Sequence, residues 1–488
     1  MAHSERFPTF RAMAASGRRL RGPTFRGLWR RRRGIGLAAV VAFIVVLGWA
    51  MVLGSVSGRR YEAELAAIRR RGEPLTLAEA APRPVPNSQN AALLYIKAAR
   101  LLPRDSRWRE DFLTLRRVQP PHPLGPAPIL AAVAKGAEPA VAVLREAARR
   151  ERCVFPWWSA SQDGRTLSLE SLNLLAPLLR VHGEARAQSG DPQAGWKDLA
   201  AIVGLARHLN QDPTSLSQTG SLVALRMARK LLPSLLASGT LLGGGSRRID
   251  RTLSELNPEG MGYRAVLTER CAWLQSFELA RGGTVAPLWS HAGPGHLGWL
   301  GGGEQSEHPS WQASTLRWFA GTFPPLRQAL VAGEGAAYLQ SWARTVEFSR
   351  GSGPPWDASD SIPTPRWSPW RPLLCGDAPY GMSNRSLAAL STAYAAEMRW
   401  ALALARYRHQ RGTYPSSLDQ AAPLLGGAPP LDPFSGKSLR YHREGDGYLL
   451  YSVGRNGRDD GGVQDAFPRG GQPSRREQRD DISFRVPA

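Results

Sequence analysis

The sequence predicts a mainly α-helical protein with one transmembrane helix near its N-terminus and a small α+β module at its C-terminus. Three observations lead to this prediction. Residues 34–58 form an uncharged apolar run directly after a block of arginines. Much of the middle of the chain places apolar residues at helical spacing, which favours a helical bundle or a set of helical hairpins. Residues 439–452 instead alternate in side-chain character around a short turn, as the two strands of a hairpin do.

The composition excludes several classes of protein. A length of 488 residues allows roughly two to three domains. The net charge of +23 is carried almost wholly by arginine, with only five lysines, and no zinc-finger, basic-zipper or aromatic RNA-binding motif accompanies it. We therefore expect no nucleic-acid partner. Three cysteines, Cys153, Cys271 and Cys375, form no C-x-x-C pair, which excludes a zinc ribbon and a thioredoxin-type motif.

The N-terminal region predicts a membrane anchor. Residues 1–33 are a polar, arginine-rich tail, and the following apolar run exceeds the ~20 residues that a helix needs to cross a bilayer. We therefore predict a transmembrane helix at residues 34–57 that acts as a signal anchor. A signal peptide cleaved near Ser55 and Ser57 is the alternative, but its apolar core would be shorter, at about 7–15 residues. The positive-inside rule predicts a single-pass protein of the bacterial inner (plasma) membrane, with a cytoplasmic N-terminus and an extracytoplasmic, periplasmic bulk.

A helical domain is predicted at residues 87–350, after a juxtamembrane linker at residues 58–86. Its clearest helix pair surrounds the sequence Gly190-Asp191-Pro192, where glycine ends one helix, aspartate caps the next and proline occupies its first turn. The pairing is loosely similar to tetratricopeptide-type hairpins, although no 34-residue period is present, so a non-repeating bundle is the other interpretation. Both interpretations indicate a role in packing or protein contact.

Residues 281–310 form a glycine-rich segment with three histidines, His291, His296 and His308. Histidines can hold first-row transition metals, so a membrane-anchored, metal-dependent hydrolase is one interpretation of this loop. The spacing matches no zinc motif and there is no H-E-x-x-H sequence, which favours a surface loop instead. No catalytic residue is predicted elsewhere in the chain.

The C-terminal module is predicted at residues 383–488, after a linker rich in proline and tryptophan at residues 351–382. Residues 383–411 have the pattern of a long amphipathic helix that Gly412 ends. The hairpin follows, with the sequence EGDG as its turn, and DISFRV at residues 481–486 predicts a last strand.

The motifs RGTYPSSLDQ, LDPFSGKSLRY, GYLLYSVGRNGRDDGG and DDI occur in this order. As an ordered set they resemble the C-terminal domain of the major pseudopilins of type II secretion systems and related pilin-like proteins. The resemblance covers about the last fifth of the chain, and it implies a long helix against an antiparallel sheet with a calcium-binding loop after one strand. Here some 325 residues separate the apolar run from that helix, so we expect no polymerisation into a pseudopilus.

By this resemblance, calcium would be held by oxygen atoms of the loop, which suits an ion that takes six to eight oxygen ligands. Asn456 stands where relatives usually have aspartate, and the Asn456-Gly457 pair also favours a tight turn, so a purely structural turn is the alternative. The candidate ligands are Leu450 (through its carbonyl group), Ser452, Asn456, Asp459, Asp480 and Asp481.

Together these patterns predict a membrane-anchored structural or interaction protein of the bacterial cell envelope. We expect other envelope proteins as its partners, in an assembly related to secretion or pili. Calcium is the only cofactor that we expect.

Overall fold

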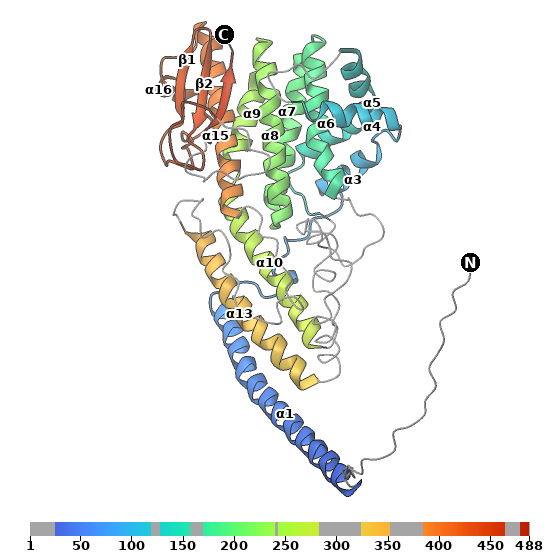
Figure 1. Ribbon diagram of the computed structural model, residues 1–488. Coiled ribbons are helices and arrows are strands. Elements are labelled where there is room, and N and C mark those ends of the chain that lie inside the picture. The colour runs from blue at the N-terminus through green and yellow to red at the C-terminus, as the bar shows by residue number, and fades with distance from the viewer. Residues whose placement is uncertain are drawn as a thin grey trace, which may run out of the picture.

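Most of the chain is helical in the computed structural model, which describes residues 25–118, 127–155, 158, 169–239, 243–282, 324–351, 384–463 and 479–487. One small antiparallel sheet lies near the C-terminus (Figure 1). The elements of the first half are α1 (Phe25–Arg70), α2 (Leu77–Ala80), α3 (Ala91–Arg100), α4 (Ser106–Leu115), α5 (Ala127–Arg149), α6 (Leu169–Gln188), α7 (Pro192–Gln211) and α8 (Ser215–Ala237). Those of the second half are α9 (Gly243–Ser254), α10 (Pro258–Arg281), α13 (Pro324–Arg350), α15 (Asn384–Arg411), α16 (Leu418–Ala421), the 3-10 turn η3 (Ala422–Leu424), β1 (Arg440–Glu444), β2 (Gly447–Ser452) and β3 (Ile482–Val486).

The apolar run at residues 34–57 is the middle of α1, a single helix of 46 residues. Within the part of the chain that the structure describes, no helix combines the length and the apolar character that a membrane crossing requires. The predictions of a transmembrane helix, a signal anchor, a single-pass topology and a place in the bacterial inner membrane are therefore wrong. The orientation that was derived from them, with a cytoplasmic N-terminus and a periplasmic bulk, falls with them. These predictions were based on the apolar run alone. In the structure, the helix α1 extends beyond this run on both sides, into turns that carry arginines. Several apolar side chains of this helix, among them Leu37, Ile44 and Trp49, are exposed.

The second half of α1 belongs to the folded core, where it runs along α13 and near α10 (Figure 1). Tyr61 and Ile68 are buried there against Leu274 and Leu339. The ring of Tyr61 lies so close to Gly335 that a Cβ atom on this glycine would be 2.7 Å from it. Glycine at this position therefore lets α1 and α13 approach each other closely.

Helices α5 to α9 form the body, and the turn between α6 and α7 has the conformation that its sequence predicts. Gly190 has a positive φ of 85° after the end of α6. The Asp191 side chain accepts a hydrogen bond from the Ala194 N–H group at 3.1 Å, and Pro192 is the first residue of α7. The turn reverses the chain, and α6 and α7 then pack along each other.

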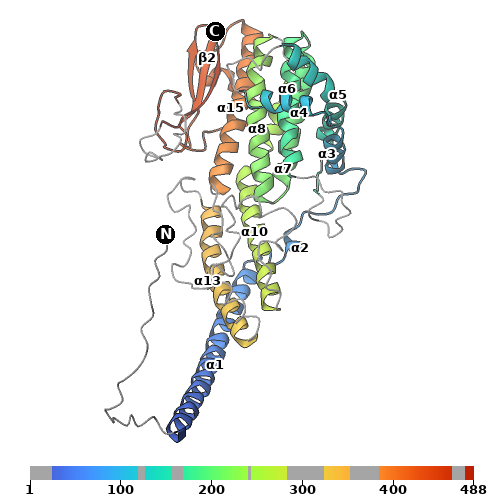
Figure 2. The same ribbon diagram turned by 45° about the vertical axis from the view of Figure 1, so that its right-hand side comes forward.

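The C-terminal helix α15 packs into the same core as the body instead of standing apart from it. It contacts α8, α9 and α10, and Trp400 and Leu404 of α15 share one buried cluster with Leu225 of α8. The three strands lie on the outer side of α15, as Figure 2 shows, in the order β1-β2-β3. In the antiparallel register, Leu450 of β2 is opposite Tyr441 on one side and Phe484 on the other, and all of β2 is buried.

The predicted linker at residues 351–382 lies almost wholly outside the described residues.

Candidate functional site

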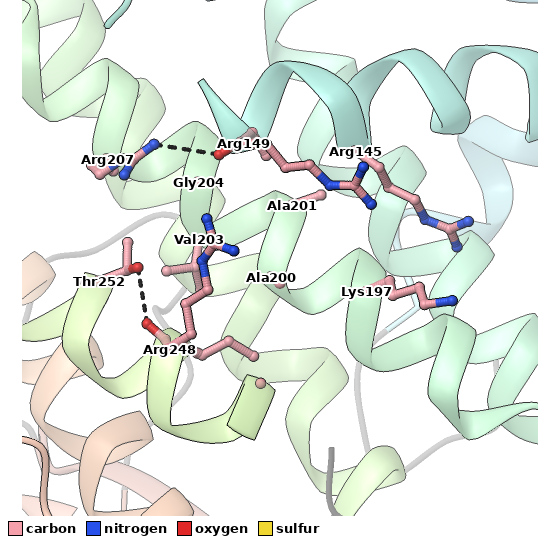
Figure 3. Close-up of a pocket in the computed structure, with 13 residues that line it drawn as sticks. Arg145, Arg149, Lys197, Ala200, Ala201, Val203, Gly204, Arg207, Arg248 and Thr252 are labelled. Carbon is pink, nitrogen blue, oxygen red and sulfur yellow. Dashed lines mark hydrogen bonds between the residues drawn. The ribbon is translucent and has the colours of Figure 1, made fainter. Parts of the chain in front are cut away.

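A cleft of about 210 Å³ opens where α5, α7 and α9 meet (Figure 3). We call it the basic cleft, because five of its side chains are cationic. The cations are Arg145, Arg149, Lys197, Arg207 and Arg248, and the remaining lining residues are Ala148, Ala200, Ala201, Val203, Gly204, Gly245, Ile249 and Thr252.

The floor of the basic cleft is apolar and tightly packed. Ala201, Val203 and Ile249 are almost completely buried beneath it. A Cβ atom on Gly204 would lie 2.7 Å from the Cβ atom of Ala148, so this glycine is needed for α5 and α7 to come so close. The close approach keeps the cleft shallow, since no space remains between the two helices at its base.

Helical spacing brings the cations to the rim of the basic cleft. Arg145 and Arg149 are one turn apart on α5 and therefore lie on one face of that helix. Lys197 and Arg207 belong to α7, and Arg248 comes from α9. Three helices thus each contribute positive charge to the same small cavity.

Two of the five cations are fixed by other groups of the protein. The Arg145 Nε atom is 2.7 Å from the Asp198 Oδ1 atom. Arg207 donates hydrogen bonds to the carbonyl oxygens of Ala148 at 3.3 Å and Arg150 at 2.5 Å. These contacts hold the two guanidinium groups at the edge of the cleft.

The other three cations, Arg149, Lys197 and Arg248, are exposed. Within the described chain, their charged ends have no ion-pair or hydrogen-bond partner. In Figure 3, Arg149 and Arg248 reach over α7 from opposite sides. No aspartate or glutamate is among the lining residues that the structure describes. The arrangement can therefore take up negative charge from a ligand.

A second group of charged residues, which we call the His182 cluster, is connected to Arg145 through Asp198. It consists of His182, Asp198, Glu138 and Arg186. Asp198 is completely buried, and its Oδ2 atom is 2.6 Å from the Nδ1 atom of His182. The other ring nitrogen of His182 is 2.9 Å from Glu138, which also pairs with Arg186. Burial opposes the charged form of His182, but the hydrogen bonds and charges of Asp198 and Glu138 together raise its pKa above the usual value.

The C-terminal loop holds the predicted calcium ligands, and its shape depends on Gly454. This glycine has a positive φ of 64°, and a Cβ atom there would clash with the Asp480 carbonyl group. The absence of a side chain thus lets the loop after β2 meet the start of β3. Asp481 is consequently buried, and its Oδ2 atom accepts hydrogen bonds from the Asp460 and Gly462 N–H groups at 2.9 and 2.7 Å.

The remaining oxygen of Asp481, Oδ1, is buried and accepts no hydrogen bond from the described residues. Burial, reinforced by the nearby charges of Asp460 and Asp459 and opposed by the two N–H groups, raises the pKa of Asp481 to about 6. A cation beside Oδ1 would favour the charged carboxylate that the site otherwise disfavours.

The other predicted ligands do not converge on Asp481. The Ser452 hydroxyl donates to Asp432 at 2.7 Å, and Asp459 accepts from Tyr451 at 2.8 Å. Asn456 bonds Asp460, whereas Asp480 accepts from the Arg455 N–H group, and Leu450 lies in the middle of β2. In the part of the chain that the structure describes, no three His, Cys, Asp or Glu side chains are grouped to hold a metal ion.

The alternative metal site at His291, His296 and His308 lies outside the described residues. Of the cysteines, Cys153 and Cys271 are both free and buried. Burial raises the pKa of each thiol, so neither is held as a reactive thiolate.

No protein-family model, no curated protein and no solved structure matches this chain. The resemblance of the C-terminal module to pseudopilins therefore stays a prediction.

The basic cleft was not predicted from the sequence, because its four arginines and one lysine are spread over residues 145–248 and resemble ordinary cations of a helix surface. The available signal was the pair Arg145 and Arg149, which are one helical turn apart in the predicted helical domain. The fold determines which other helices face that pair, and the sequence pattern does not predict this arrangement.

Proposed function

We propose that this protein is a non-catalytic interaction protein that binds a small anionic ligand in the basic cleft. One observation carries the proposal: five cationic side chains from three helices surround a cavity, and none of its described lining residues carries a carboxylate. Like charges that converge in this way repel each other, and a bound anion would replace that repulsion with attraction.

The arrangement is suited to oxyanions in particular. A guanidinium group presents planar N–H donors that match phosphate and carboxylate oxygens, and charge-assisted hydrogen bonds of this kind contribute about 1.5–3 kcal/mol each. Gly245 in the first turn of α9 also lines the cleft, so the positive end of that helix dipole adds to the field. Two or three such contacts would give an affinity on the order of micromolar to millimolar, once the cost of ordering the side chains is subtracted.

The residues of the cleft favour binding over catalysis. Among the described side chains of the lining, Thr252 alone carries a hydroxyl group, and that hydroxyl donates to the Arg248 carbonyl oxygen at 3.0 Å. The lining thus offers no base beside the hydroxyl to activate it, which a nucleophile would need. The expected role as an interaction protein agrees with this chemistry.

Isothermal titration of the full chain with inorganic phosphate tests the proposal. Binding should be measurable and should weaken as salt rises, because exposed charges are screened. The double variant Arg149→Gln/Arg248→Gln should lose at least about 90 % of the affinity, which corresponds to ~1.4 kcal/mol.

The matched control is Arg247→Gln/Arg251→Gln, which also removes two exposed arginines, both from the same helix as Arg248, without touching the cleft. This variant should bind as the parent protein does. Equal losses in the control and in the double variant would show that only the overall positive charge matters, and the proposal would fail.

Calcium binding in the C-terminal loop is a second proposed function, supported by the buried Oδ1 atom of Asp481, which has no hydrogen-bond partner among the described residues. Asp459, Asp460 and Asp480 lie in the same loop region, where a divalent cation would offset the repulsion among carboxylates. When bound, the ion would supply charge and rigidity to the loop.

Thermal unfolding of the full chain, with calcium or with a chelator, tests this second function. A ligand at 100 times its Kd stabilises the folded state by about 2.7 kcal/mol, so calcium should raise the Tm. The variant Asp481→Asn should abolish the increase. Superimposable unfolding curves with calcium and with chelator would exclude the calcium site.

A further inference from the structure

The basic cleft combines two kinds of surface, and together they restrict its ligand. Its rim carries exposed cations, whereas its floor is formed by Ala148, Ala200, Ala201 and the buried Val203. A cleft that bound only a hydrated ion would gain nothing from an apolar floor. The floor instead favours an apolar group that leaves water on binding.

The cations favour a doubly charged head group. Arg149 and Arg248 reach over α7 from opposite sides, so one anion between them would meet two guanidinium groups (Figure 3). A phosphoryl group carries up to two charges and three acceptor oxygens, and can pair with both groups at once. A single carboxylate has one charge to share between them.

The dimensions of the cleft limit the rest of the ligand. Its volume of about 210 Å³ lies below the roughly 300–1,000 Å³ of pockets for drug-sized molecules. The contact between Gly204 and Ala148 closes its base, so a ligand must lie on the floor and cannot extend between the helices. A short, flat apolar body fits these limits.

We infer that the basic cleft takes a small phosphate monoester with an apolar body such as an aromatic ring. Its phosphoryl group lies between Arg149 and Arg248, and its ring lies on Ala200 and Ala201. This inference rests on the proposed function, since it requires that the cleft binds anions.

Isothermal titration of the full chain at constant ionic strength, with phenyl phosphate, inorganic phosphate and phenol as separate ligands, tests the inference. Phenyl phosphate should bind about tenfold more tightly than inorganic phosphate, because its ring covers part of the floor. Phenol alone should show no binding, since it lacks the charge that the rim attracts.

A substitution in the floor distinguishes the contribution of the ring to binding from that of the phosphoryl group. Ala200 is partly exposed on α7, and Ala200→Leu would fill the floor without changing any charge. This variant should keep the affinity for inorganic phosphate and lose the preference for phenyl phosphate. If Ala200→Leu fails to fold, Ala200→Ser serves instead, since a hydroxyl group on the floor should also reduce the preference.

The outcomes distinguish this inference from the proposed function. Equal affinities for phenyl phosphate and inorganic phosphate would overturn the inference and leave anion binding intact. Binding of phenol as tight as that of phenyl phosphate would also overturn it, because the rim would then contribute nothing. No binding of either phosphate compound would overturn both.

Discussion

The buried ion pairs of the core and the basic cleft use the same kinds of side chain in opposite ways. In the core, Asp250 of α9 accepts hydrogen bonds from Arg399 at 2.9 Å and from Arg406 at 3.1 Å, and all three residues are buried. In the basic cleft, Arg149 and Arg248 are exposed and meet no carboxylate among its described lining residues. The core arginines are thus neutralised where they connect helices, whereas Arg149 and Arg248 remain available to a ligand.

The core pairs also connect segments that are far apart in the sequence. Asp250 joins α9 to α15, and Arg229 of α8 pairs with the buried Glu397 of α15 at 2.5 Å. The same Arg229 also bonds the carbonyl group of Ser483 in β3. These contacts fix the C-terminal helix and sheet onto the body, which gives the core arginines a structural role.

The largest effect is expected from Asp250→Ala, which leaves two buried arginines without their carboxylate. Breaking a buried ion pair in this way costs about 3–5 kcal/mol of unfolding free energy. Urea denaturation measures this loss of unfolding free energy. The control is Glu255→Ala, which removes an exposed carboxylate just after α9. If Asp250→Ala lowers the unfolding free energy no more than the control does, the core ion pairs contribute no more to stability than surface charges, and the contrast with the cleft is wrong.

An intermediate effect is expected from the His182 cluster. The pKa of His182 is raised in the folded protein, because Asp198 and Glu138 outweigh the opposing effect of burial. The cluster therefore contributes its full stability below the ordinary histidine pKa of about 6.5 and loses it as pH rises through the raised value. Urea denaturation between about pH 5 and 9 should show this decline.

The variant His182→Gln should remove the part of the decline that His182 causes, and should lower stability at acidic pH by about 1–3 kcal/mol. His409→Gln, at the exposed end of α15, is the matched control and should leave the profile unchanged. If the decline persists in full without His182, other groups cause it and the cluster does not act as described.

The smallest effect on stability is expected in the basic cleft. Arg248→Gln should change the unfolding free energy by no more than about 0.5 kcal/mol, because its side chain is exposed and unpaired within the described chain. Arg399→Gln, in the core, should destabilise the protein strongly by comparison. Similar losses in both variants would show that Arg248 has a structural role and would remove the contrast.

The sequence predicted local structure better than the arrangement of the elements. Gly190, Asp191 and Pro192 mark a helix boundary through their own backbone preferences, so they could be interpreted without a fold. The same holds for the hairpin of β1 and β2, whose register follows from its short turn. The sequence was sufficient to predict a structural feature wherever neighbouring residues determine that feature.

Features that depend on distant contacts were not predictable in this way. The apolar run of α1 suggested a membrane helix, because the pattern does not show the continuous helix that surrounds it. The basic cleft combines α5, α7 and α9, and Asp481 acquires its buried position only when the loop after β2 meets β3. Each of these depends on packing between segments, which a single sequence does not specify.

If the exposed cations of the basic cleft bind a ligand, a crystal structure of the full chain with phenyl phosphate should show the ligand there. We predict phosphoryl oxygens at about 2.7–2.9 Å from the guanidinium groups of Arg149 and Arg248, with the ring on the floor of the cleft. Phenyl phosphate bound elsewhere, with these two arginines unchanged, would show that the basic cleft is not its binding site.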